Sequence, residues 1–209
     1  MTQVGVGEIM DQSFTENTEI LRQVERYVTA AMAGNDPAHD DGHVRRVVAL
    51  TRQLCAAEPG VDGFRAELLA WLHDMQDDKL ATNTGSDALA AHLAELQIPQ
   101  ADARFVLEAL PYISYRKHPR LSEDVALEIR IVQDADRIDA MGAIGIARTF
   151  AYGGAKGRPL ADSLAHFDEK LLRLYDLLST DAGRALALPR YHFLQEFYRQ
   201  FARESEENG

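Results

Sequence analysis

The sequence LLAWLHDMQDDK, from Leu68 to Lys79, places a His-Asp pair at the end of an apolar run. The apolar side chains around it recur at helical spacing: Phe64, Leu68, Trp71, Leu72 and Met75. A lone histidine on such a face is more often a packed core residue than a ligand, but His73 is followed directly by Asp74. Because adjacent helix positions point about 100° apart, the pair can hold one ion only at the edge of a groove.

Helical periodicity recurs outward from this segment, and strand patterns are almost absent. We expect helices at about 18–33, 41–54, 64–75, 86–96, 102–110, 123–150, 163–178 and 182–204. Pro189 is expected to kink or interrupt the last of them. Gly142 and Gly145 each cost about 1 kcal/mol against Ala inside a helix, so we interpret them as points of close helix approach. The pattern predicts an all-α helical bundle.

Composition and charge exclude several classes of protein. The chain has 209 residues, 22 basic and 33 acidic, with a net charge of -11. This balance argues against stable nucleic-acid binding, which requires a basic surface. No apolar run reaches the length of a membrane span, and the N-terminus does not resemble a secretory signal. A single cysteine, Cys55, suits a reducing cytoplasm, so we expect a cytoplasmic protein that binds no membrane.

Ionisable residues also interrupt apolar faces elsewhere. Asp136 continues the line of Val125, Ile129 and Val132, and a buried carboxylate is unfavourable unless it is paired or bound to a metal. An ion pair with Arg137 or Arg148 explains Asp136 equally well on this pattern alone. Asp134 is expected to lie off the buried line. His43, in AHDDGHVRRVV (38–48), is a further candidate on another apolar helix.

Two histidines and two aspartates from three helices would form a mixed nitrogen and oxygen site, which suits Mn, Fe, Co, Ni or Mg better than structural zinc. The order His43, His73-Asp74, Asp136 matches the H…HD…D signature of the HD-domain metal-dependent phosphohydrolases. The segments HDDGHVRRV, LLAWLHDMQDDK and IVQDADRIDAMGAIGIARTFAYGG resemble the small bacterial branch of that superfamily, which is similar to nucleotide pyrophosphohydrolases. The resemblance covers nearly the whole chain beyond the first twenty residues.

The resemblance implies a fold and a ligand set. It implies one domain over 1–209, with an HD metal-binding core at about 20–152 and a C-terminal helical extension at about 160–205 packed on it. It also implies one divalent ion, with Mn favoured and Mg, Co, Ni or Fe as alternatives. The implied metal ligands are His43, His73, Asp74 and Asp136. The other dipeptide, His39-Asp40, is interpreted as a helix entrance at which Asp40 accepts from backbone N–H groups.

The family chemistry is hydrolysis of phosphate esters or anhydrides, for which a metal lowers the pKa of a bound water. Asp74 and Asp77 are the catalytic candidates, although a solvated carboxylate explains Asp77 equally well. Positive groups must hold the phosphates. The candidates for substrate contact are Arg46, Lys79, Arg116, Lys117, His118 and Asp139. We interpret Arg120 and Arg137 as surface residues.

These observations favour a phosphohydrolase that binds a small phosphorylated substrate, most simply a nucleotide. The favoured reaction converts a (deoxy)nucleoside triphosphate to its monophosphate and pyrophosphate. The alternatives are a 5′-nucleotidase or phosphodiesterase of the same superfamily, and a non-catalytic nucleotide-sensing module. Apolar side chains in the C-terminal helices also allow a homodimer.

Overall fold

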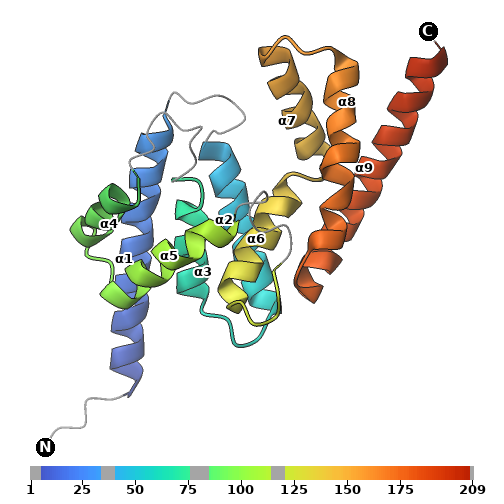
Figure 1. Ribbon diagram of the computed structural model, residues 1–209. Helices are drawn as coiled ribbons and strands as arrows, with labels where there is room; N and C mark the ends of the chain where they lie inside the picture. The colour runs from blue at the N-terminus through green and yellow to red at the C-terminus, as the bar shows by residue number, and fades with distance from the viewer. Residues whose placement is uncertain (1–5, 34–40, 76–84, 114–120, 208–209) are drawn as a thin grey trace, which may run out of the picture.

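The computed structural model describes residues 6–33, 41–75, 85–113 and 121–207. Within these ranges every regular element is helical (Figure 1). The α-helices are α1 (Val6–Met32), α2 (Asp41–Ala57), α3 (Gly63–Leu72), α4 (Gly85–Glu95), α5 (Gln100–Ile113), α6 (Leu127–Asp139), α7 (Gly142–Ala155), α8 (Leu160–Glu169) and α9 (Asp181–Glu207). Two 3-10 turns, η2 (Leu171–Arg173) and η3 (Tyr175–Leu177), join α8 to α9. The predicted all-α class is confirmed.

Helix α3 lies at the centre of the core. It packs against α1, α2, α5 and α6, and α2 also packs along α6. Every residue from Ala66 to Leu72 is buried, as expected for a helix that is covered on all sides. At its start the Asp62 side chain accepts from the backbone N–H of Arg65, an N-cap. Because α3 ends at Leu72, the His73-Asp74 pair follows the last turn and can leave the helix axis.

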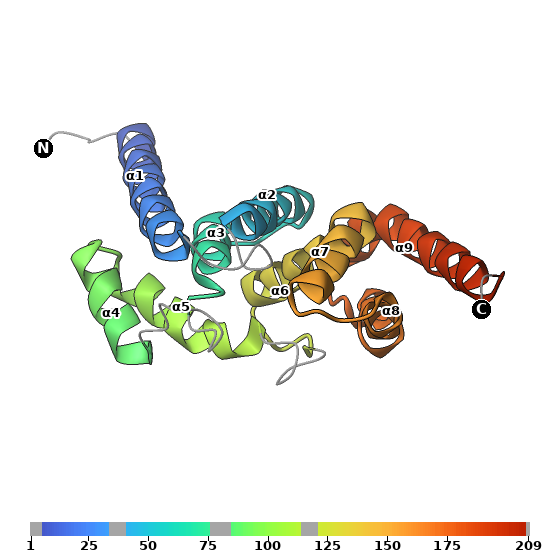
Figure 2. The ribbon, with the colours of Figure 1, turned by 90° about the horizontal axis from the view of Figure 1, so that it is seen from above.

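Helices α7, α8 and α9 form a second group, with α9 also contacting α6 and α2. Seen from above, α1 and α9 lie at opposite ends of the molecule (Figure 2). An aromatic cluster joins the second group: Phe150, Phe167, Phe197, Tyr198 and Phe201. Helix α9 continues through Pro189, so the predicted interruption is wrong, and a kink there stays a prediction. Its buried face, with Ala187 and Leu194 fully buried, is anchored on both sides of the proline.

The predicted helix at 123–150 is wrong, because it is two helices. Helix α6 ends at Asp139 and α7 begins at Gly142, whose φ of +70° favours glycine. A Cβ on Gly145 would lie 2.0 Å from the carbonyl oxygen of Ala140, so only glycine permits this close approach. The two glycines therefore mark a change of direction between α6 and α7.

Other boundaries also shift. Helix α1 begins twelve residues before the expected Thr18, at Val6, and the segment after Glu169 turns to 3-10 geometry instead of continuing an α-helix. The division into a core at about 20–152 and an extension at about 160–205 stays a prediction.

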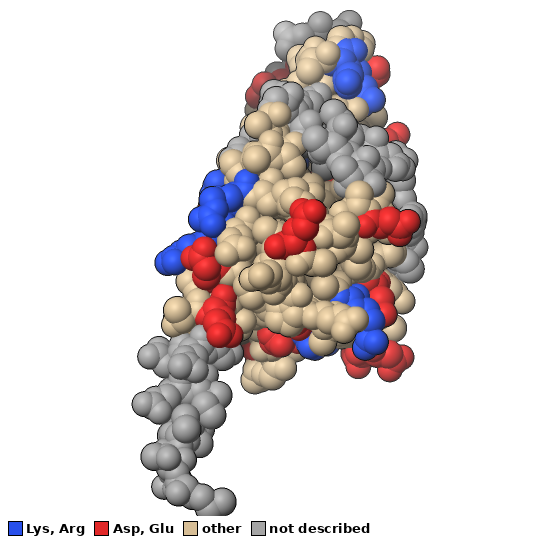
Figure 3. Space-filling view, turned by 90° about the vertical axis from the view of Figure 1, so that its left-hand side faces the viewer, with Lys and Arg blue, Asp and Glu red and all other residues tan. Residues whose placement is uncertain are grey.

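Two further features of the described residues are the distribution of surface charge and the hydrophobicity of the helices. On the face shown in Figure 3, Lys and Arg side chains form separate groups with Asp and Glu beside them. Among the described helices, none combines the length and hydrophobicity that crossing a membrane requires.

Candidate metal centre

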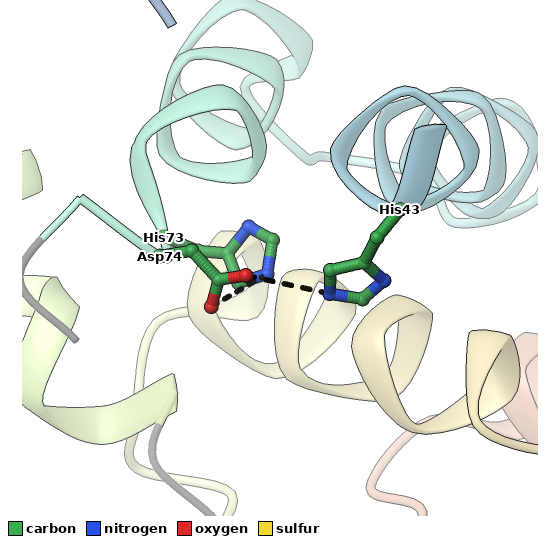
Figure 4. A group of neighbouring side chains, drawn as sticks. All are labelled: His43, His73 and Asp74. Carbon is green, nitrogen blue, oxygen red and sulfur yellow. Dashed lines mark ion pairs between the residues drawn. The ribbon is translucent and has the colours of Figure 1, made fainter. Parts of the chain in front are cut away.

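The first turn of α2 directs His43 into the core. The helix buries Val44, Val47 and Val48 on the same side, and only 4 % of His43 is exposed. Figure 4 shows its ring pointing from α2 toward the end of α3, above α6. The rings of His43 and His73 meet edge to face, with centroids 5.3 Å apart.

His73 is oriented by the helix that precedes it. Its Nδ1 lies 2.8 Å from the carbonyl oxygen of Ala70. A carbonyl oxygen only accepts, so Nδ1 carries the hydrogen and Nε2 presents a lone pair. Nε2 is buried and has no hydrogen-bond partner among the described residues. Buried polar atoms almost always have a partner, and a metal ion bound at Nε2 would supply one.

Asp74 lies between the two histidines. Its Oδ1 is 3.3 Å from His73 Nε2, and its Oδ2 is 3.6 Å from His43 Nε2 (Figure 4). One ligand atom from each of His43, His73 and Asp74 falls within 4.8 Å of the others. From α6, Asp136 brings its Oδ1 to 3.4 Å from His43 Nε2. All four residues expected to bind metal therefore meet at one place, and their mixed donors fit a divalent ion.

The local charges are strongly coupled. Burial alone would lower the pKa of His43, but hydrogen bonds to Asp136 and Asp139 and the charge of Asp74 raise this pKa to about 9. Burial would raise the pKa of Asp136, yet the hydrogen bond and charge of His43 hold it well below its usual range. Lys170 in the C-terminal region adds to this lowering. Asp136 is thus an ionised carboxylate at neutral pH, as a metal ligand must be.

Asp139 and Arg46, which were both expected to contact substrate, bind each other. Their contact with substrate stays a prediction. The Asp139 side chain is 1 % exposed, and its Oδ1 accepts from Arg46 Nε at 2.7 Å. Its Oδ2 accepts from His43 Nδ1 and from Arg148 Nη1, each at 2.7 Å. Burial would raise the pKa of Asp139, but His43 and Arg46 lower it, so the carboxylate stays ionised.

Two residues of α6 correct the sequence interpretation. Asp134 was expected off the buried line, but it is fully buried and accepts from the backbone N–H groups of Ser179 and Thr180 at 2.9 and 2.8 Å. Arg137 was interpreted as a surface residue, but it is 3 % exposed and donates to the carbonyl oxygen of Leu177. Both errors have one cause: α6 packs against α9 and binds the segment 177–180 as well as the core, so more than one of its faces is buried.

Several predicted residues lie outside the described residues. These are Asp77, Lys79, Arg116, Lys117 and His118, together with His39 and Asp40 at the expected entrance to α2. Sequence reasoning also missed the role of Arg148, which was considered only as a partner for Asp136. No sequence pattern indicated its pairing with Asp139, because that pairing depends on the break between α6 and α7.

Comparison with known proteins places this geometry in a family. No family model matches the sequence. The chain is 35% identical over 189 residues to the uncharacterized protein YpgQ of Bacillus subtilis, covering 87% of this chain and 92% of YpgQ. Its structure resembles an HD-superfamily hydrolase from Bacillus thuringiensis with a TM-score of 0.73 and 35% identity, covering 91% and 98% of the two chains. The chain belongs to the HD superfamily of hydrolases.

A further likeness is to a nucleotide complex. The crystal structure of B. subtilis YpgQ in complex with ADP matches with a TM-score of 0.79 and 32% identity, covering 90% of this chain and 96% of that one. The likeness to the HD-superfamily hydrolase supports a metal-dependent phosphohydrolase. The HD family also implies a divalent metal, which His43, His73 and Asp74 are placed to bind.

Proposed function

We propose that this HD protein hydrolyses (deoxy)nucleoside triphosphates to the monophosphate and pyrophosphate, using one divalent ion, with Mn favoured. One observation carries the proposal: the buried Nε2 of His73 has no hydrogen-bond partner among the described residues and faces the carboxylate of Asp74. His43, His73, Asp74 and Asp136 would hold the ion. When bound, such an ion lowers the pKa of a water and polarises a phosphoryl oxygen.

The nucleotide part of the proposal is supported by YpgQ, which has been crystallised in complex with ADP. Hydrolysis to pyrophosphate requires water to attack the α-phosphorus while the bond to the β-phosphate oxygen breaks. We assign Asp77 to accept a proton from the attacking water, and Asp74 to the metal and the reacting centre. Substrate phosphates are assigned to Lys79, Arg116, Lys117 and His118. These assignments rest on the sequence.

Two further parts of the proposal concern the cell compartment and the oligomeric state. We place the protein in the cytoplasm, because its one cysteine has no second cysteine within the chain to form a disulfide. We also propose a homodimer, since large apolar side chains are exposed in the C-terminal helices, including Leu160, Leu188 and Phe193.

Product analysis tests the reaction. Protein stripped of metal by a chelator is incubated with nucleoside mono- and triphosphates, with Mn, Mg, Co or Ni added in turn. We expect monophosphate and pyrophosphate with a metal, and no product from His73→Ala protein. Orthophosphate from monophosphates would instead identify a nucleotidase. Tight nucleotide binding without turnover in any metal would identify a sensor.

A further inference from the structure

The change of direction between α6 and α7 returns Arg148 to the end of α6. Arg148 follows Asp139 by nine residues, so along an uninterrupted helix their Cα atoms would be about 13.5 Å apart along the axis and on opposite faces. In the structure Arg148 Nη1 lies 2.7 Å from Asp139 Oδ2. The Gly142 conformation and the close approach at Gly145 make this return possible.

Asp139 connects this arginine to the candidate metal centre. The same Oδ2 accepts from His43 Nδ1 at 2.7 Å, so Arg148 Nη1 and His43 Nδ1 lie 3.1 Å apart. Arg46 Nε binds the other oxygen at 2.7 Å. An ionised carboxylate only accepts, so Nδ1 of His43 must carry the hydrogen. In the neutral imidazole that binds a metal, the lone pair of His43 then lies on Nε2, which faces Asp74 and Asp136.

We propose that Asp139 and Arg148 are positioning residues of the metal centre. Arg148 orients the Asp139 carboxylate, and Asp139 in turn fixes the tautomer and ring direction of His43. The inference rests on the proposed function to the extent that a divalent ion occupies the site. It makes α7, a helix of the C-terminal group, a structural part of a centre whose expected ligands come from α2, α6 and the end of α3.

The physical reason is the fixed geometry of the buried carboxylate. Outer partners of this kind raise the basicity of a ligating histidine and hold its ring, and their loss lowers metal affinity by roughly 10- to 100-fold. With Arg148 removed, Arg46 would still donate to both oxygens of Asp139, at 2.7 and 3.2 Å, but Oδ2 would lose its shorter arginine contact. The carboxylate could then rotate away from His43 Nδ1, and Nε2 would lose its direction.

The test is a calorimetric titration of metal-free protein with Mn²⁺, which needs no substrate. We expect Asp139→Asn to weaken Mn²⁺ binding roughly 10- to 100-fold and Arg148→Met about 10-fold. The double variant should bind as weakly as Asp139→Asn alone, because Arg148 acts through Asp139. Arg148→Lys, which keeps the charge, should recover part of the affinity. Circular dichroism checks the helix content of each variant.

Arg45→Met is the matched control. Arg45 lies on α2 beside Arg46, but it is exposed and pairs with Glu25, so its loss should change the Mn²⁺ affinity by no more than about twofold. Unchanged Mn²⁺ affinity in folded Arg148→Met protein, with a raised KM for nucleotide, would make Arg148 a phosphate contact and overturn the inference. Additive losses in the double variant would also overturn it. If wild-type protein binds Mn²⁺ but turns over no nucleotide, the proposed function fails and the inference stands.

Discussion

His73 donates through Nδ1 to the carbonyl oxygen of Ala70, 2.8 Å away in the last turn of α3. The contact uses one of the C-terminal carbonyls that an α-helix leaves without an internal partner. It therefore satisfies the end of the helix and fixes the ring of His73 at the same time. The same contact decides which nitrogen of His73 is available to a ligand.

Replacement of His73 by alanine should abolish metal binding without unfolding the protein. We expect Mn²⁺ affinity to fall by more than the roughly 100-fold that follows loss of an outer partner, because a ligand is removed. Metal content after dialysis and calorimetric titration measure the loss. His92→Ala is the control: His92 stacks on Tyr27 with centroids 3.8 Å apart and pairs with Glu95. Equal metal loss in both variants would contradict the assignment.

The raised pKa of His43 predicts opposite pH effects on stability and on metal binding. In metal-free protein this pKa rises from 6.5 to about 9. Its stabilising contribution is therefore fully present below about pH 6.5 and is lost as the pH rises through 9. Metal binding must displace that proton, so Mn²⁺ affinity should increase about tenfold per pH unit below 9.

Thermal denaturation and Mn²⁺ titration between pH 6 and 9 measure the two effects on the same protein. Asp139→Asn, which removes one of the carboxylates that raise this pKa, should flatten both curves. A metal-free melting temperature that stays constant or increases across this range would contradict the prediction.

Asp134 should matter for stability and not for metal binding. Its carboxylate accepts from the Ser179 and Thr180 N–H groups and from Thr180 Oγ1, all in the segment before α9. Asp134→Ala leaves these buried donors without an acceptor, so we expect unfolding to become easier by about 2–4 kcal/mol. Chemical denaturation measures this change. Asp181→Ala, at a side chain that is 96% exposed, should change stability by at most about 0.5 kcal/mol.

The close approach at Gly145 links the helix break to the candidate metal centre. Gly145→Ala would place a methyl group 2.0 Å from the Ala140 carbonyl oxygen, so α7 must shift. We expect lower stability and, because the Arg148–Asp139 contact moves with α7, weaker Mn²⁺ binding. Gly154→Ala, in the same helix with nothing within 4 Å, should stabilise α7 by roughly 0.5–1 kcal/mol. Unaltered Mn²⁺ binding by Gly145→Ala protein would contradict the link between the helix break and the candidate metal centre.

The sequence predicted the helical class from local periodicity, and the order of the motifs predicted that four residues from three distant segments would meet. The spacing around His73 indicates a buried helix, and the structure places His43 and Asp74 beside that ring. That they bind a metal stays a prediction. The family resemblance was needed to choose His43 over His39, since the two histidines stand only four residues apart in the sequence, where an apolar helix is expected to begin.

The remaining differences come from tertiary packing. Periodicity along α6 identifies one buried face and cannot show that α9 and the segment 177–180 cover others, which is why Asp134 and Arg137 were placed wrongly. Gly142 and Gly145 were interpreted as close-packing positions. The change of chain direction there comes from the positive φ of Gly142 and the close approach at Gly145, which the sequence alone does not show. Because the pairing of Asp139 with Arg148 depends on that change of direction, no pattern in the sequence predicts it.

The crowding of α6 has a consequence for anyone recombining this chain with a homologue. Between Asp134 and Asp139 the helix anchors the segment before α9, contributes to the candidate metal centre and meets α7. A crossover just after Asp139 would join an aspartate from one parent to an arginine from the other. Chimeras should therefore inherit α6 through α9 as one block, and crossovers between α4 and α5 should be better tolerated.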